Sequence, residues 1–107
     1  MVRYGSGSVR RRPRLDANQQ ELVAALRKAG ATVHSLAAIG GGCPDLLVGW
    51  HGQTLLMEVK DGSLSPSRRK LTDDEENWRS AWSGGTVWVI TSLQDALDAM
   101  QIAEGPM

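Results

Sequence analysis

The sequence predicts a single α/β domain whose elements follow the order helix, three strands, helix, strand, helix. Three observations indicate this class: apolar residues at helical spacing near both ends of the chain, two apolar runs on either side of a short polar turn, and a β-branched and aromatic run at 86–90. The chain has 107 residues, which is enough to bury one core but not two. We therefore expect one catalytic or binding unit.

The first helix is predicted to begin at Leu15. Apolar side chains recur along one helical face, Asp16 or Asn18 can cap the start, and Gly30 follows two basic residues as a typical helix end. The segment 32–36 then alternates weakly between polar and apolar residues, which predicts a strand.

A β-hairpin is predicted in the middle of the chain. Gly40-Gly41-Gly42 indicates a flexible turn, and it precedes two apolar runs at 45–48 and 54–60. The segment Trp50-His51-Gly52-Gln53 between the two runs is typical of a hairpin connection.

The second helix is predicted to span 73–82. Thr72 and Glu75 have the spacing of a capping box, and Gly84-Gly85 follows the last helical position. The next segment, 86–90, has the composition of a strand that is buried on both faces.

The last helix is predicted to start at Ser92, with Asp95 as its capping partner. Its helical spacing is expected to bury Leu93, Leu97 and Met100.

Several classes are excluded by composition. A single cysteine, Cys43, cannot form an internal disulfide, and no Cys/His cluster of zinc-binding spacing is present. No stretch has the length of a membrane span, and the N-terminus lacks the apolar core of a signal peptide. We therefore expect a cytoplasmic protein with no membrane partner.

The tryptophans are assigned mainly to the core. Trp78, Trp82 and Trp88 fall at predicted core positions, whereas Trp50, beside the hairpin turn, is a candidate for base stacking or a dimer contact.

The zero net charge hides a strong asymmetry. Five arginines precede Leu15 with no acid among them, so we predict a disordered basic tail at 1–14 and a domain at 15–107. A second basic run lies in the expected loop at 62–70. Both runs could hold nucleic-acid phosphates, although a solvated tail and loop would account for them equally well. The candidate nucleic-acid-binding residues are Arg10, Arg11, Arg12, Arg14, Arg68, Arg69 and Lys70.

The most informative pattern is Asp45 followed thirteen positions later by Glu58 and then by Lys60. On a strand, the period of two points Glu58 and Lys60 to the same side. Two carboxylates supply hard oxygen ligands for Mg²⁺, and an ammonium can orient water and stabilise a phosphorane. A turn aspartate with an exposed charge ladder is the alternative, but the strand around Glu58 is mostly apolar, which favours a site.

This order of elements, with Pro44-Asp45 and Glu58-Val59-Lys60, resembles the PD-(D/E)xK nuclease superfamily. The runs 16–19, 42–49 and 58–62 look like the small stand-alone VRR-NUC-type proteins of phages and prophages. The resemblance implies a restriction-endonuclease-like αβββαβ core, with a mixed central sheet flanked by helices. It also implies an endonuclease that uses Mg²⁺ or Mn²⁺, acts on DNA such as four-way junctions or other branched forms, works as a homodimer, and comes from a phage or prophage of a bacterial host.

The resemblance also implies individual roles. Asp45 and Glu58 would be metal ligands, the carbonyl of Val59 a backbone ligand, and Lys60 a neighbour of the attacking water.

The flanking helices contribute two further candidate catalytic residues. Related sequences commonly have a glutamate at the position of Gln19, whose amide brings no charge, so a second metal site is not predicted. Glu75 would approach Lys60 or the phosphate, or act only in the capping box. Two other functions stay open: a non-catalytic nucleic-acid-binding module that keeps the fold, and a pairing or scaffold subunit of a phage replication complex.

Overall fold

Helices and strands follow one another in the order that the sequence predicts. The computed structural model describes residues 13–106, with side chains from Asn18 onward, so the expected tail at 1–12 lies outside the described residues. The elements are α1 (Pro13–Lys28), β1 (Thr32–Ser35), β2 (Leu46–Trp50), β3 (Gln53–Val59), the 3₁₀ helix η2 (Pro66–Arg68), α2 (Asp73–Ala81), β4 (Val87–Ile90) and α3 (Leu93–Glu104).

The first helix begins earlier than predicted. Helix α1 starts at Pro13 rather than Leu15, because proline is well tolerated in a first helical turn, and Arg14 therefore belongs to the helix. No described helix has the length and apolar character needed to cross a membrane.

The four strands form one mixed sheet in the order β1-β2-β3-β4. Strands β1 and β2 are antiparallel, β2 and β3 form the predicted hairpin, and β4 runs parallel to β3. The hairpin turns through His51 and Gly52, which have φ of 46° and 81°. Positive φ at both central residues is the pattern of a type I′ turn, whose twist matches that of paired strands.

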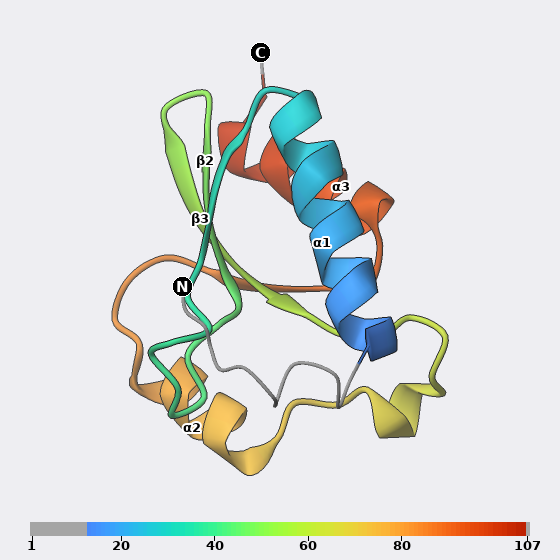
Figure 1. Cartoon of the computed structure of the whole chain (residues 1–107). Coiled ribbons are helices and arrows are strands. Elements are labelled where there is room, and N and C mark those ends of the chain that lie inside the picture. Colours follow the sequence, from blue (N-terminus) through green and yellow to red (C-terminus); the bar gives the residue numbers. More distant parts are fainter. Residues whose placement is uncertain (1–12, 107) are drawn as a thin grey trace.

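One face of the sheet carries the hydrophobic core. Helices α1 and α3 lie side by side on this face (Figure 1). Leu26, Met57 and Met100 are each at most 1% exposed, and they join α1, β3 and α3 in one cluster. The alternation of β3 follows the prediction, since Leu55, Met57 and Val59 are buried on this face.

The opposite face is only partly covered, and this corrects two predictions. Strand β4 is not buried on both faces, because it is an edge strand and Val89 is 42% exposed. Leu93 is also not buried. It lies at the first position of α3 and is 39% exposed, while Ala96, Ala99 and Met100 provide the buried face of the helix.

Helix α2 lies apart from α1 and α3, beside the loop that joins β1 to β2 (Figure 1). The two segments touch closely, because a Cβ at Gly42 would overlap the Asp74 carbonyl. The predicted capping box is present, with Thr72 and Glu75 bonded reciprocally. Neither Trp78 in this helix nor Trp82 just after it is buried, so the core positions predicted for these two tryptophans are wrong. Trp78 is half-buried and stacks on Trp82, which is 43% exposed.

Candidate active site

Asp45 is positioned by the start of the hairpin. It immediately precedes β2, and the pairing of Leu46 with Met57 places Asp45 opposite Glu58. Its Oδ2 accepts a hydrogen bond of 2.8 Å from the Val59 N–H. The N–H and C=O of one strand residue point to the same neighbouring strand, so the Val59 carbonyl faces the Asp45 side as well.

Glu58 is the one buried charged side chain among residues 18–106, with 4% exposure. Its strand position points it to the sheet face away from α1 and α3. Burial, the charge of Asp45, and hydrogen bonds to Glu75 and Asp45 raise the pKa of Glu58 to about 9. At neutral pH the metal-free protein therefore holds a proton on this carboxyl.

Lys60 connects this pair to the second helix. Its Nζ donates a 2.7 Å hydrogen bond to Glu75 Oε1 and lies 3.8 Å from Glu58 Oε2. Burial alone would raise the pKa of Glu75, but hydrogen bonds from Lys60, from the Thr72 amide and from Glu58 hold it below its usual value. Glu75 thus serves in the capping box and as the partner of Lys60 at once, so the two roles predicted for it are compatible.

The cluster contains more carboxyl groups than ammonium groups. Glu58 and Glu75 lie against Lys60, and Asp45 lies against Glu58; once Glu58 gives up its proton, two negative charges remain, which a divalent cation would balance. Within residues 18–106, no three Asp, Glu, His or Cys side chains lie so that together they could hold a metal ion. The donor set that fits is Asp45, Glu58 and the Val59 carbonyl, with water and a phosphate oxygen completing the shell of one hard cation.

Cys43 lies beside these acids and is a poor candidate for covalent chemistry. Burial, together with the charges of Glu58 and Asp45, raises the pKa of its thiol. Because the thiolate is the nucleophilic form, these neighbours suppress its reactivity.

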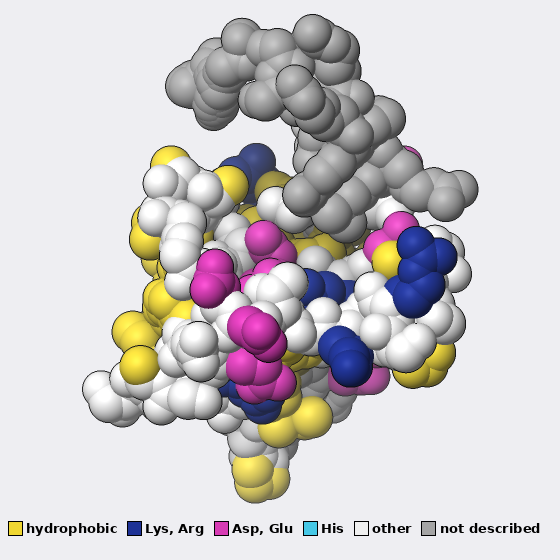
Figure 2. All heavy atoms as spheres, turned by 90° about the horizontal axis from the view of Figure 1, so that it is seen from below, with side chains coloured by type: hydrophobic (Ala, Val, Ile, Leu, Met, Phe, Trp, Pro, Cys, Tyr) yellow, Lys and Arg dark blue, Asp and Glu magenta, His cyan; other side chains and the backbone are white. Residues whose placement is uncertain are grey.

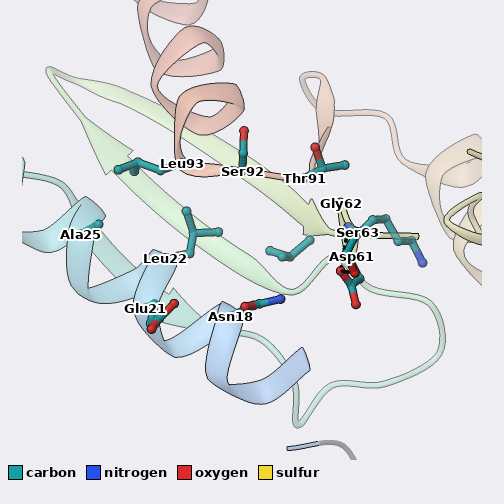
Figure 3. A pocket seen from close by; sticks show the side chains of 12 residues that line it. Asn18, Glu21, Leu22, Ala25, Asp61, Gly62, Ser63, Thr91, Ser92 and Leu93 are labelled. Atoms are coloured by element: carbon teal, nitrogen blue, oxygen red, sulfur yellow. Dashed lines mark hydrogen bonds between the residues drawn. The ribbon is translucent and has the colours of Figure 1, made fainter. Parts of the chain in front are cut away.

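A pocket of about 570 Å³ lies around the end of β3, on the side that faces α1 and α3. Figure 3 shows Asn18 and Leu22 projecting from α1 toward it, with Thr91 and Ser92 across from them. Lys60 lines this pocket, so the pocket adjoins the carboxylate cluster. Its lining residues are Asn18, Glu21, Leu22, Ala25, Val59, Lys60, Asp61, Gly62, Ser63, Thr91, Ser92 and Leu93.

Gln19 has no hydrogen bond to the cluster of Asp45, Glu58 and Lys60 in the part of the chain that is described. It is half-buried on α1. Its neighbours Asn18 and Glu21 line the pocket instead. This pocket is not predicted from the sequence. A sequence feature that could have indicated it is the pair of polar segments that directly follow two strands. These are Asp61 to Ser63 after β3, and Thr91 with Ser92 after β4.

The predicted nucleic-acid-binding residues differ in their surroundings. Arg68 and Lys70 are exposed, whereas Arg69 Nη1 donates to the carbonyls of Gly62 and Leu64 and so holds the loop after β3 in shape. Figure 2 shows acidic side chains gathered at the centre of one face, with lysine and arginine side chains beside them. Arg10, Arg11 and Arg12, and the side chain of Arg14, lie outside the described residues.

Comparison of the chain with protein families, with curated proteins and with solved structures found no match. The cluster of Asp45, Glu58 and Lys60 is therefore the observation from which a function can be inferred.

Proposed function

We propose that the protein is a metal-dependent endonuclease that hydrolyses phosphodiester bonds in DNA, using Mg²⁺ or Mn²⁺. The observation that carries the proposal is the buried Glu58, which lies against Asp45 and within 3.8 Å of the Lys60 ammonium. A carboxyl group in this environment destabilises the fold at neutral pH, because it is desolvated and repelled by its neighbours. Strongly perturbed carboxyl groups of this kind are typical of functional sites.

The three central residues have distinct roles in the proposal. Asp45 and Glu58 hold the cation together with the Val59 carbonyl, since all three are hard oxygen donors. The bound ion, when present, supplies an activated water and neutralises charge on the phosphate. Lys60 places an ammonium beside the reacting phosphate, where it orients water and stabilises developing negative charge.

Glu75 acts as a positioning residue. Its Oε1 accepts from both Lys60 Nζ, at 2.7 Å, and the Thr72 amide, at 2.8 Å. The start of α2 therefore holds the Glu75 carboxylate in place, and this carboxylate in turn holds the Lys60 ammonium in place. Loss of such a supporting contact typically lowers activity by about 10- to 100-fold.

DNA binding would rest on basic residues around the acidic centre. Arg68 and Lys70 are exposed on the loop after β3, and the arginines before Leu15 add a second basic segment. Contacts of this type position a phosphate backbone without reading its sequence. The resemblance to VRR-NUC-type proteins supports branched DNA as substrate, and a homodimer would supply two sites for symmetric cuts.

The experiment is a cleavage assay on four-way junctions, flaps, nicked duplexes, plain duplexes and single strands. We expect products with Mg²⁺ or Mn²⁺ and none with EDTA, with branched substrates cut faster than plain duplex. If all five substrates stay intact with either metal, the proposal is wrong.

A second candidate function is a non-catalytic nucleic-acid-binding module. It is favoured by the absence, within residues 18–106, of a group of three side chains able to hold a metal by themselves. Such a module would bind DNA without metal-dependent cleavage, so Asp45→Asn would have no cleavage to abolish.

A further inference from the structure

The pocket beside Lys60 has a composition that points to one class of ligand. Four apolar side chains provide its inner surface: Leu22 and Ala25 of α1, Val59 of β3, and Leu93 of α3. Its volume of about 570 Å³ lies within the range of pockets that hold small organic groups. An apolar surface of this size suits a flat ring rather than an extended charged chain.

The polar groups at the rim mostly accept hydrogen bonds. The Ser63 hydroxyl donates to Asp61 at 2.6 Å, and the Thr91 hydroxyl donates to Asp95 at 2.8 Å, so both oxygens retain only acceptor capacity. The carboxylate of Glu21 is an acceptor as well, whereas Asp61 Oδ1 is already occupied by the Ser63 amide and hydroxyl. Apart from Asn18, Lys60 and Ser92, the polar groups of the rim are acceptors, which favours a ligand that carries N–H donors.

We infer that this pocket binds an amino-bearing nucleobase, that is adenine, cytosine or guanine rather than thymine, of the nucleotide next to the scissile phosphate. Carboxylate oxygens accept from the exocyclic amine of cytosine, and an amide such as Asn18 can pair with adenine, whereas thymine has no exocyclic amine. The inference rests on the proposed nuclease function for its position in the reaction, and it deepens that function by naming the substrate class.

Lys60 separates the place proposed for the base, in the pocket, from the place proposed for the phosphate, at the carboxylate cluster. Lys60 directs its Nζ to Glu75 and Glu58 while it also lines the pocket. A phosphate at the cluster therefore leaves the adjoining nucleoside beside the pocket entrance. A base can enter only if it is unstacked and unpaired, which is easiest where the DNA is already single-stranded or branched. The substrate is thus DNA with an unpaired amino-bearing base, rather than thymine, at the cut.

Nuclear magnetic resonance titration of the full chain with free nucleosides tests the pocket without any cleavage. We expect deoxycytidine and deoxyadenosine to shift the backbone amides of Leu22, Ala25 and Leu93, with thymidine at least about fivefold weaker because it forms one fewer donor contact. Ala25→Met should remove these shifts by filling the pocket. Ala24→Met is the matched control, because Ala24 is exposed on the same helix and does not line the pocket.

Glu21→Gln provides a second variant that should fold, since Glu21 is exposed. It adds N–H donors to the rim, so the preference for deoxycytidine over thymidine should shrink or reverse. The inference is overturned if thymidine binds as well as deoxycytidine, or if no nucleoside shifts the pocket amides. It is also overturned if agmatine, an extended cation used as the alternative ligand, shifts these amides while the nucleosides do not. If no nucleoside binds but DNA is still cleaved, only the base-pocket inference is wrong. If nucleosides bind but no DNA substrate is cleaved, the nuclease function is wrong.

Discussion

Replacement of Glu58 by glutamine should make the metal-free protein more stable at neutral and alkaline pH, while it removes activity. The pKa of Glu58 is raised to about 9 in the folded protein, against 4.5 for an ordinary glutamate. Below the lower value both states hold the proton, so the free energy of unfolding is unaffected. Between the two values only the folded state holds it, so unfolding releases a proton and stability falls as pH rises.

The expected size of the effect follows from this window. A full proton released on unfolding changes the free energy of unfolding by about 1.36 kcal/mol per pH unit at 25 °C. Between pH 6 and pH 8 the wild-type protein should therefore lose roughly 2.7 kcal/mol through Glu58. A glutamine amide at this position can donate to Asp45 or Glu75, as the single O–H of the protonated carboxyl does, and it has no proton to lose.

Urea denaturation of both proteins at pH 6 and pH 8, without metal, measures this difference. Other groups titrate in the same range, so the relevant quantity is the difference between the two slopes. Glu76→Gln, an exposed acid on α2, should keep the wild-type slope. If wild type and Glu58→Gln lose the same stability between the two pH values, Glu58 is not a buried, protonated carboxyl and the electrostatic account of the site is refuted.

Three further predictions concern the surroundings of the site. Gly42→Ala should lower the melting temperature and cleavage more than Gly41→Ala does, because both glycines have positive φ but only at Gly42 would a Cβ meet α2. Thr72→Ala should lower the free energy of unfolding by about 1 kcal/mol in urea denaturation, through loss of the capping bond. Glu75→Gln should slow single-turnover cleavage by about tenfold or more with little loss of DNA affinity, since it weakens the hold on Lys60; an unchanged rate would show that Glu75 serves only as a cap.

Features set by neighbouring residues could be predicted from the sequence. The hairpin and the capping box at Thr72 depend on contacts within a few positions, and both are present. The side that each residue of β3 faces follows from its period of two, so Glu58 and Lys60 could be placed together. Asp45 could be joined to them because a hairpin brings the start of one strand opposite the end of the next.

Features set by long-range packing could not be predicted. The composition of β4 suggests burial on both faces, but its place at the sheet edge leaves Val89 exposed. Similarly, the spacing of α3 includes Leu93, but the face of α3 that is buried carries Ala96, Ala99 and Met100 instead. The pocket was missed because it joins α1 to the ends of β3 and β4, and local patterns contain no information on that junction.

The central claim is that Asp45, Glu58 and Lys60 form a metal-dependent nuclease centre. The most direct measurement compares cleavage of the best-cut branched DNA by Asp45→Asn and by Asp98→Asn, with Mg²⁺ and with equal DNA occupancy. Asp98 is an exposed acid on α3, far along the chain from the cluster. We predict that Asp98→Asn cuts at the wild-type rate, and that Asp45→Asn binds the DNA with unchanged affinity but is at least about 100-fold slower. Equal cleavage by the two variants would contradict the assignment.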